Sequence, residues 1–195
     1  MEIVRDEGRW SLLLQPDGVV VTVCWVIRVA DGFELFVPRA LGEPALARLV
    51  RFRLRVQCTI TLGEADDGPF ALTAELVEAG WPGAGEFEAG LVPHAFGRSF
   101  VDATVSFTKG CFTGQELVGR LDARGANVPW RLVRARGSRL ERVETVLRSK
   151  GPEGPQGVTT VVAREGGVSV LGFAHRSLLG TALQVVVDDV AVELL

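Results

Sequence analysis

The amino-acid sequence predicts an α+β protein whose C-terminal part is a small antiparallel β-barrel. Near the start, two strand-like segments, Trp10–Leu14 and Val19–Val29, flank Gln15-Pro16-Asp17-Gly18, which has the composition of a tight turn. Apolar residues from Pro44 to Leu54 recur with helical spacing. Beyond Pro129, short strand-like segments alternate with turns rich in Gly, Pro and Asp, which is typical of a barrel.

The other elements follow from the same two periodicities. Further strands are expected at Phe33–Val37, Val56–Leu62 and Thr104–Phe107, and a second helix at Phe70–Ala79. Leu140–Arg148 fits a strand or a short helix. The barrel strands are predicted at Trp130–Ala135, Val158–Val162, Val168–Phe173, Thr181–Val187 and Val190–Leu195.

The length of 195 residues allows one or two domains, and Asn127-Val128-Pro129 is a candidate boundary. We therefore predict domains at residues 1–128 and 129–195. Apolar residues make up 47% of the chain, but no apolar run is long enough to cross a bilayer, so no membrane partner is expected. The N-terminus has neither the basic start nor the apolar core of a secretory signal, and we expect a cytoplasmic protein.

Cysteine and histidine are too few and too scattered to predict a metal centre. Cys24, Cys58 and Cys111 form no Cys-x-x-Cys pair, and the chain has only two histidines. We therefore expect no metal site, and this chain alone is not expected to hold an iron–sulfur cluster through several thiolates.

Charge is distributed unevenly along the chain. Residues 58–97 carry seven acidic side chains and neither Lys nor Arg, whereas residues 109–150 carry ten basic and four acidic side chains. A basic stretch of this kind could attract RNA phosphates or a polyglutamylated ligand. A solvated face balanced by the acidic segment is the commoner arrangement, so direct RNA binding is not expected.

One stretch has the features of a reactive loop. It reads Lys109-Gly110-Cys111-Phe112-Thr113-Gly114-Gln115-Glu116. Thr113 and Glu116 have the spacing of a capping box, which would place Cys111 just before a helix N-terminus and near the Lys109 ammonium. Both features favour a thiolate over a thiol. From the residues alone, a reactive thiol and a buried, inert cysteine both stay open.

The same stretch, continued through Val118, Arg120, Arg124, Gly125 and Asn127, resembles the signature of the YgfZ family of folate-binding proteins. These proteins are relatives of the glycine-cleavage T-protein. Glu78-Ala79-Gly80-Trp81-Pro82 resembles the segment before that signature, and Gly157–Thr160 with Leu171–Phe173 resembles the family's C-terminal barrel. The resemblance implies a shortened T-protein-like folate-binding domain, made of an antiparallel sheet with helices, ahead of the barrel.

The resemblance also implies a function and its residues. It implies a folate-binding accessory protein for the assembly or repair of iron–sulfur proteins, acting indirectly in tRNA modification. Tetrahydrofolate would be the cofactor, iron–sulfur client or assembly proteins would be the partners, and Cys111 would be the functional thiol. The folate-binding residues implied by the resemblance are Glu78, Lys109, Gly110, Phe112, Gly114, Gln115 and Glu116.

The chain departs from the family pattern in three places. It has only a loop where relatives have a further strand–helix block, so a homodimer or an obligate partner is expected to cover the incomplete sheet. The position of the T-protein's catalytic aspartate falls at Val21 or Thr22, which cannot act as an acid or base, so aminomethyltransferase activity is not expected. Leu72 replaces a folate-binding tryptophan of relatives. The alternative function is therefore a non-catalytic interaction module that has lost folate binding.

Overall fold

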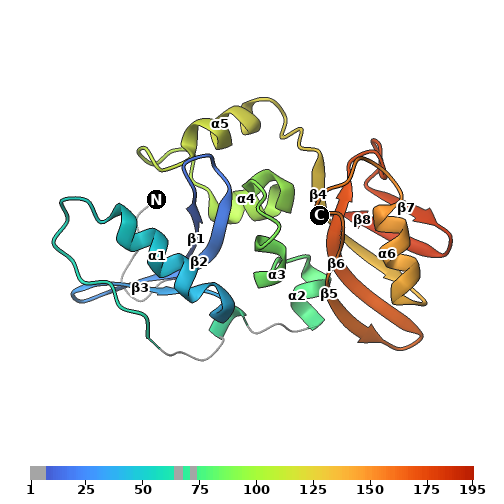
Figure 1. Ribbon diagram of the computed structural model, residues 1–195, viewed down its shortest axis with the longest axis horizontal. Helices are drawn as coiled ribbons and strands as arrows, with labels where there is room; N and C mark the ends of the chain where they lie inside the picture. Colours follow the sequence, from blue (N-terminus) through green and yellow to red (C-terminus); the bar gives the residue numbers. More distant parts are fainter. Residues whose placement is uncertain (1–7, 64–67, 71–73) are drawn as a thin grey trace.

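The computed structural model describes residues 8–63, 68–70 and 74–195, and it contains two antiparallel sheets with helices between and beside them (Figure 1). The first sheet has the strand order β1-β2-β3, and the second has the order β5-β6-β4-β8-β7. The predicted α+β class is therefore confirmed. Whether the first part has a T-protein-like fold, and whether the domains divide after residue 128, stay predictions. Within the described ranges, no helix is long and apolar enough to cross a membrane.

The N-terminal sheet is built as the sequence predicts. β1 (Arg9–Leu14) and β2 (Val20–Val29) pair antiparallel around the predicted turn, in which the Gly18 N–H donates to the Gln15 carbonyl at 2.9 Å. Gly18 has a φ of +77°, a left-handed conformation that favours glycine. β3 (Gly32–Phe36) pairs with β2 and forms one edge of the sheet.

Helices fill the middle of the described chain. The first, α1 (Gly42–Phe52), matches the predicted helix but ends two residues before Leu54. Part of the predicted helix Phe70–Ala79, including Leu72, lies outside the described residues. The other helices of this region are α2 (Ala74–Ala79), α3 (Ala84–Phe87), α4 (Arg98–Thr104) and α5 (Gln115–Ala123), with 3₁₀ turns at Arg39–Leu41, Gly68–Phe70 and Pro93–Phe96.

Two predicted strands of the middle region are wrong. Val56–Leu62 belongs to no strand and is almost entirely exposed, because no described strand lies alongside to pair with it. The predicted strand Thr104–Phe107 does not form, because Thr104 is the last residue of α4 and residues 105–107 belong to neither a helix nor a strand. Within α4, Phe100, Val101 and Thr104 are buried with helical spacing. The Thr104 hydroxyl donates to the Phe100 carbonyl one turn earlier, at 2.7 Å.

All five predicted C-terminal strands are present, and they pair antiparallel. Leu140–Arg148, which fitted a strand or a helix, is helix α6. The strands are β4 (Trp130–Gly137), β5 (Gly157–Arg164), β6 (Gly167–His175), β7 (Gln184–Val187) and β8 (Val190–Leu194).

The predicted barrel is wrong, because these five strands form an open sheet with β5 and β7 at its edges. Both faces of the sheet are covered by other elements. On one face, α6 packs Val143 and Leu147 into an apolar cluster with strand residues. On the other face, Leu132 and Phe173 belong to the same core as the N-terminal sheet and α3 to α5. A sheet covered on both faces buries its apolar side chains without closing on itself.

Candidate functional site

Cys111 lies in the loop between α4 and α5, and its side chain is exposed. The alternative of a buried cysteine is therefore wrong, and the reactivity of the thiol stays a prediction. The Lys109 ammonium lies 4.9 Å from the centre of the Phe112 ring, a cation–π distance. Phe112 is half-buried and packs against the main core. The thiol is thus presented to solvent by a loop that is anchored one residue later.

Gly114 holds the end of this loop against the N-terminal hairpin. Its φ is +81°, and it is the N-cap residue of α5. A Cβ atom at Gly114 would lie 2.8 Å from the Cα of Gly18 and 2.9 Å from the carbonyl oxygen of Gln15. Glycine is therefore required here both for the left-handed backbone and for the close approach to the β1–β2 turn. This requirement is met without any ligand.

The polar residues of the motif serve the local structure. The side-chain oxygen of Gln115 accepts a hydrogen bond from the Phe112 N–H at 3.1 Å and so closes the loop. The predicted capping box is wrong, because Thr113 precedes the N-cap and no side chain caps α5. Glu116 instead forms an ion pair with Arg120 one turn along the helix.

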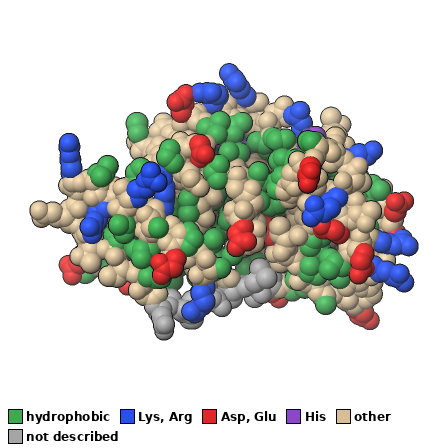
Figure 2. All heavy atoms as spheres, in the orientation of Figure 1, with side chains coloured by type: hydrophobic (Ala, Val, Ile, Leu, Met, Phe, Trp, Pro, Cys, Tyr) green, Lys and Arg blue, Asp and Glu red, His purple; other side chains and the backbone are tan. Residues whose placement is uncertain are grey.

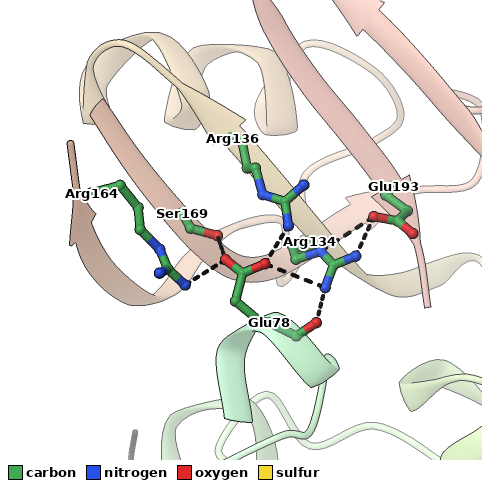
Figure 3. A network of polar contacts seen from close by, with 6 residues as sticks. All are labelled: Glu78, Arg134, Arg136, Arg164, Ser169 and Glu193. Atoms are coloured by element: carbon green, nitrogen blue, oxygen red, sulfur yellow. Dashed lines mark hydrogen bonds and ion pairs between the residues drawn. The ribbon is translucent and has the colours of Figure 1, made fainter. Parts of the chain in front are cut away.

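Glu78, at the end of α2, lies in a network of arginines on the second sheet (Figure 3). One carboxylate oxygen accepts from Arg164 at 2.7 Å and from Ser169 at 2.9 Å. The other oxygen pairs with Arg136 and lies 3.7 Å from a guanidinium nitrogen of Arg134. Arg134 also donates to the backbone carbonyl of Glu78, and its other terminal nitrogen lies 2.5 Å from Glu193. The network therefore ties α2 to three strands, β4, β5 and β6.

This network determines the protonation of Glu78. Partial burial acts to raise the pKa of the carboxyl group, but the hydrogen bonds from Arg136 and Ser169 and the charges of Arg136 and Arg164 lower it to about 2. The carboxylate is therefore ionised at neutral pH, and its oxygens are already occupied by donors from this chain.

The structure does not bring Glu78 and the 109–116 loop together. Figure 1 shows α2 beside the second sheet at the bottom of the molecule, and the loop next to α5 at the top. Two surface hollows, of about 630 and 260 Å³, are lined by neither Glu78 nor the loop. Among the described residues, those expected to bind folate therefore do not surround one shared cleft. Their geometry does not indicate a reaction step that involves folate.

Trp81 lies beside one of these hollows. It lines the 260 Å³ cavity together with Phe70, Gly83 and Gly85, and its indole N–H is buried without a hydrogen-bond partner. The ring also packs on Trp10, with centroids 4.9 Å apart. Trp81 therefore packs in the core of the N-terminal part and also lines the hollow.

Glu86 carries a buried carboxylate that the sequence does not predict. Glu86 of α3 is fully buried, and it accepts from the Gly83 N–H at 2.7 Å and from the Thr160 hydroxyl at 2.7 Å. Thr159 donates to the same carboxylate. These contacts join α3 to β5 across the interface between the helices and the second sheet. A Glu within a Gly-rich turn gives no local sign of burial, because the threonines that it meets on β5, Thr159 and Thr160, lie more than seventy residues away.

The described residues offer no group of three His, Cys, Asp or Glu side chains that could hold a metal ion. The exposed thiol of Cys111 therefore has no neighbouring ligand set among the described residues. Alone it could form a mixed disulfide or donate one ligand to a metal or cluster held by another protein.

Comparison with known proteins shows a partial similarity to a curated relative. No family model matches the chain. The chain is 42% identical over 65 residues to the tRNA-modifying protein YgfZ of Serratia proteamaculans (strain 568). The likeness is partial. The aligned residues make up 33% of this chain, and they span about a fifth (19%) of the length of that curated relative. The match supports a relationship to the YgfZ family over that stretch.

Proposed function

We propose that this chain is a folate-binding accessory protein of the YgfZ type that acts in the assembly or repair of iron–sulfur proteins and, through them, in tRNA modification. The observation that carries the proposal is the partial identity to a tRNA-modifying YgfZ protein. The exposed thiol of Cys111 supports it, because a thiol that acts on another protein must be reachable. Cys111 is the residue we assign to this role.

Cys58 provides a matched control for Cys111, because both are free and exposed. In a bacterial strain that lacks its own YgfZ, the wild-type chain and Cys58→Ser are expected to restore the modified tRNA, measured by mass spectrometry of nucleosides. Cys111→Ser is expected to lower that restoration by about tenfold or more, since an alcohol replaces the nucleophile. Full restoration by Cys111→Ser would remove the thiol from the function.

Folate binding is tested separately from the thiol. Tetrahydrofolate is titrated into the wild-type chain while the fluorescence of its four tryptophans is followed. Saturable quenching is expected, because a bound heterocycle near Trp81 or Trp25 would quench an indole. Calorimetry under the same conditions guards against absorption by the ligand itself. The folate part of the proposal would be contradicted if neither heat nor quenching were detected up to about 1 mM tetrahydrofolate. A Kd of about 1 mM corresponds to a binding free energy of only about −4 kcal/mol.

The second candidate is a non-catalytic interaction module that does not bind folate, and the arginine network favours it. The Glu78 carboxylate, which the family resemblance assigns to the pterin, already accepts from Arg136, Arg164 and Ser169. A ligand that needed this carboxylate would have to displace three donors. No tetrahydrofolate binding together with restored tRNA modification would select this candidate.

A further inference from the structure

Exposed apolar side chains gather at one end of the molecule. Seven of the twelve large apolar side chains that are exposed among the described residues lie between residues 33 and 62, and neither apolar core includes them. In Figure 2, green side chains lie between basic and acidic ones at the end that β3 and the loop after α1 occupy in Figure 1. The seven are Phe33, Leu35, Val50, Phe52, Leu54, Val56 and Leu62.

Residues 53–63 have the sequence of a strand without its conformation. Apolar Leu54, Val56, Cys58, Ile60 and Leu62 alternate with Arg53, Arg55, Gln57, Thr59 and Thr61. This strict period of two is what a strand with one apolar face requires. However, Arg55 has a φ of +62°, a conformation uncommon for a residue with a side chain. The Cys58 N–H donates to the Val56 carbonyl at 3.2 Å, a local turn instead of an extended backbone.

The outer edge of β3 is the complementary feature. β3 pairs with β2 on one side, and no described strand pairs with its other side. Phe33 and Leu35, which are 58% and 39% exposed, project to one face of β3, while Glu34 projects to the opposite face. An exposed edge with apolar side chains is a template for another strand.

We propose that two copies of this chain associate by strand addition, with residues 54–62 of each copy pairing along the outer edge of β3 in the other. The apolar positions of the segment then meet Phe33 and Leu35 on one face, and Arg55 meets Glu34 on the other. Charge is complementary, because Arg53 and Arg55 are basic whereas Asp31 and Glu34, at the β2–β3 hairpin, are acidic.

The strand that pairs with the β3 edge is expected to come from a second copy of this chain, because each molecule carries both halves of the contact. The segment and the edge occur on one chain and are not paired with each other. In a dimer with a two-fold axis, both segments and both edges are paired at once. Two-fold symmetry is the commonest symmetry of soluble oligomers. An unrelated partner would have to supply only one half and would leave the other exposed.

The first test is molecular mass in solution, by light scattering behind size exclusion at up to about 100 µM. The wild-type chain is expected to elute with twice the mass of one chain. Val56→Glu places a charge on the apolar side of the segment and is expected to give a monomer. Val161→Glu is the matched control, because Val161 is also exposed, at 44%, but lies on β5, and it should remain a dimer. A wild-type monomer, or a Val56→Glu dimer, would overturn the proposal.

A charge exchange distinguishes a second copy from pairing within one chain. Glu34→Arg alone and Arg55→Glu alone each put like charges across the contact, so each is expected to be monomeric. When the two proteins are mixed, Arg55 of the first variant meets Glu34 of the second, and the substituted Glu at position 55 meets the substituted Arg at position 34. Both contacts join opposite charges, so a heterodimer is expected. In hydrogen exchange, amides of residues 54–62 should be protected only in samples that dimerise. Failure of the mixture to associate, or protection in the monomers, would show that the segment pairs elsewhere.

Discussion

Replacing Glu78 by Gln tests the arginine network most directly, because the substitution keeps the shape of the side chain and removes its charge. A pKa lowered from 4.5 to about 2 corresponds to roughly 3.5 kcal/mol, at about 1.4 kcal/mol per pH unit. The carboxylate side chain is 30% exposed and that of Arg136 is 53% exposed, so solvent screens their attraction. We therefore expect Glu78→Gln to lower the free energy of unfolding by about 1–2 kcal/mol.

The assay is urea and thermal unfolding at about pH 7, followed by circular dichroism. For a chain of this size, about 1–2 kcal/mol corresponds to a fall in Tm of about 2–8 °C. Glu153→Gln is the control, because Glu153 is exposed and forms no ion pair with a described residue, so it should unfold like the wild type. Equal stability of Glu78→Gln and Glu153→Gln would refute the assignment of the network as a structural clamp.

The difference in unfolding free energy between the wild type and Glu78→Gln should also depend on pH, which gives a second test with the same variant. The pKa of Glu78 is lower in the folded chain, so its contribution to stability is complete above 4.5 and is lost as the pH falls towards about 2. The gap between wild type and Glu78→Gln should therefore shrink by roughly two-fifths between about pH 7 and about pH 3.5. A gap that stays constant over this range would mean that the lost stability does not come from the charge.

Two further predictions concern the thiol loop and a buried histidine. Gly114→Ala should cost about 1–3 kcal/mol in urea unfolding, because it combines a φ of +81° with a clash against the β1–β2 turn. Gly110→Ala should be nearly neutral, since its Cβ would meet open space, and equal costs would contradict the anchoring role of Gly114. Burial lowers the pKa of His94 below 6.5, against the opposing effect of Asp122, so stability should decline as the pH falls below about 6.5. His94→Gln should flatten that decline, and a pH profile unchanged from the wild type would contradict the assignment to His94.

The sequence predicts those elements whose signals are local. The β1–β2 hairpin carries its own turn residues, and α1 has a complete apolar stripe, so both are where the sequence indicates. The five C-terminal strands are likewise bounded by turn residues, namely glycines, prolines and the Asp188-Asp189 pair. The sequence does not decide whether Cys111 is buried or exposed, because the same loop sequence can be buried or presented to solvent.

The failures come from interactions between distant parts of the chain. The period-two pattern of Val56–Leu62 shows which face a strand would bury, but it does not supply the neighbouring strand. The predicted barrel failed because α6 and the N-terminal core cover the two faces of the sheet. The partners of Glu78 lie 58, 86 and 91 residues away, and no local pattern brings Arg136, Arg164 and Ser169 to one carboxylate.

The proposed dimer contact and the thiol loop depend on opposite ends of one strand. Gly114 presses against Gly18 in the turn that leads into β2, whereas β3 pairs with β2 only from Trp25 to Val29, at the far end. A change at the β3 edge should therefore leave the loop and its exposed thiol in place. Val56→Glu accordingly separates the two proposals, because a monomer that still restores tRNA modification would show that the thiol acts without the second copy. A monomer that fails, with Cys111 still fully reactive toward a thiol reagent, would show that the second copy itself takes part in the function.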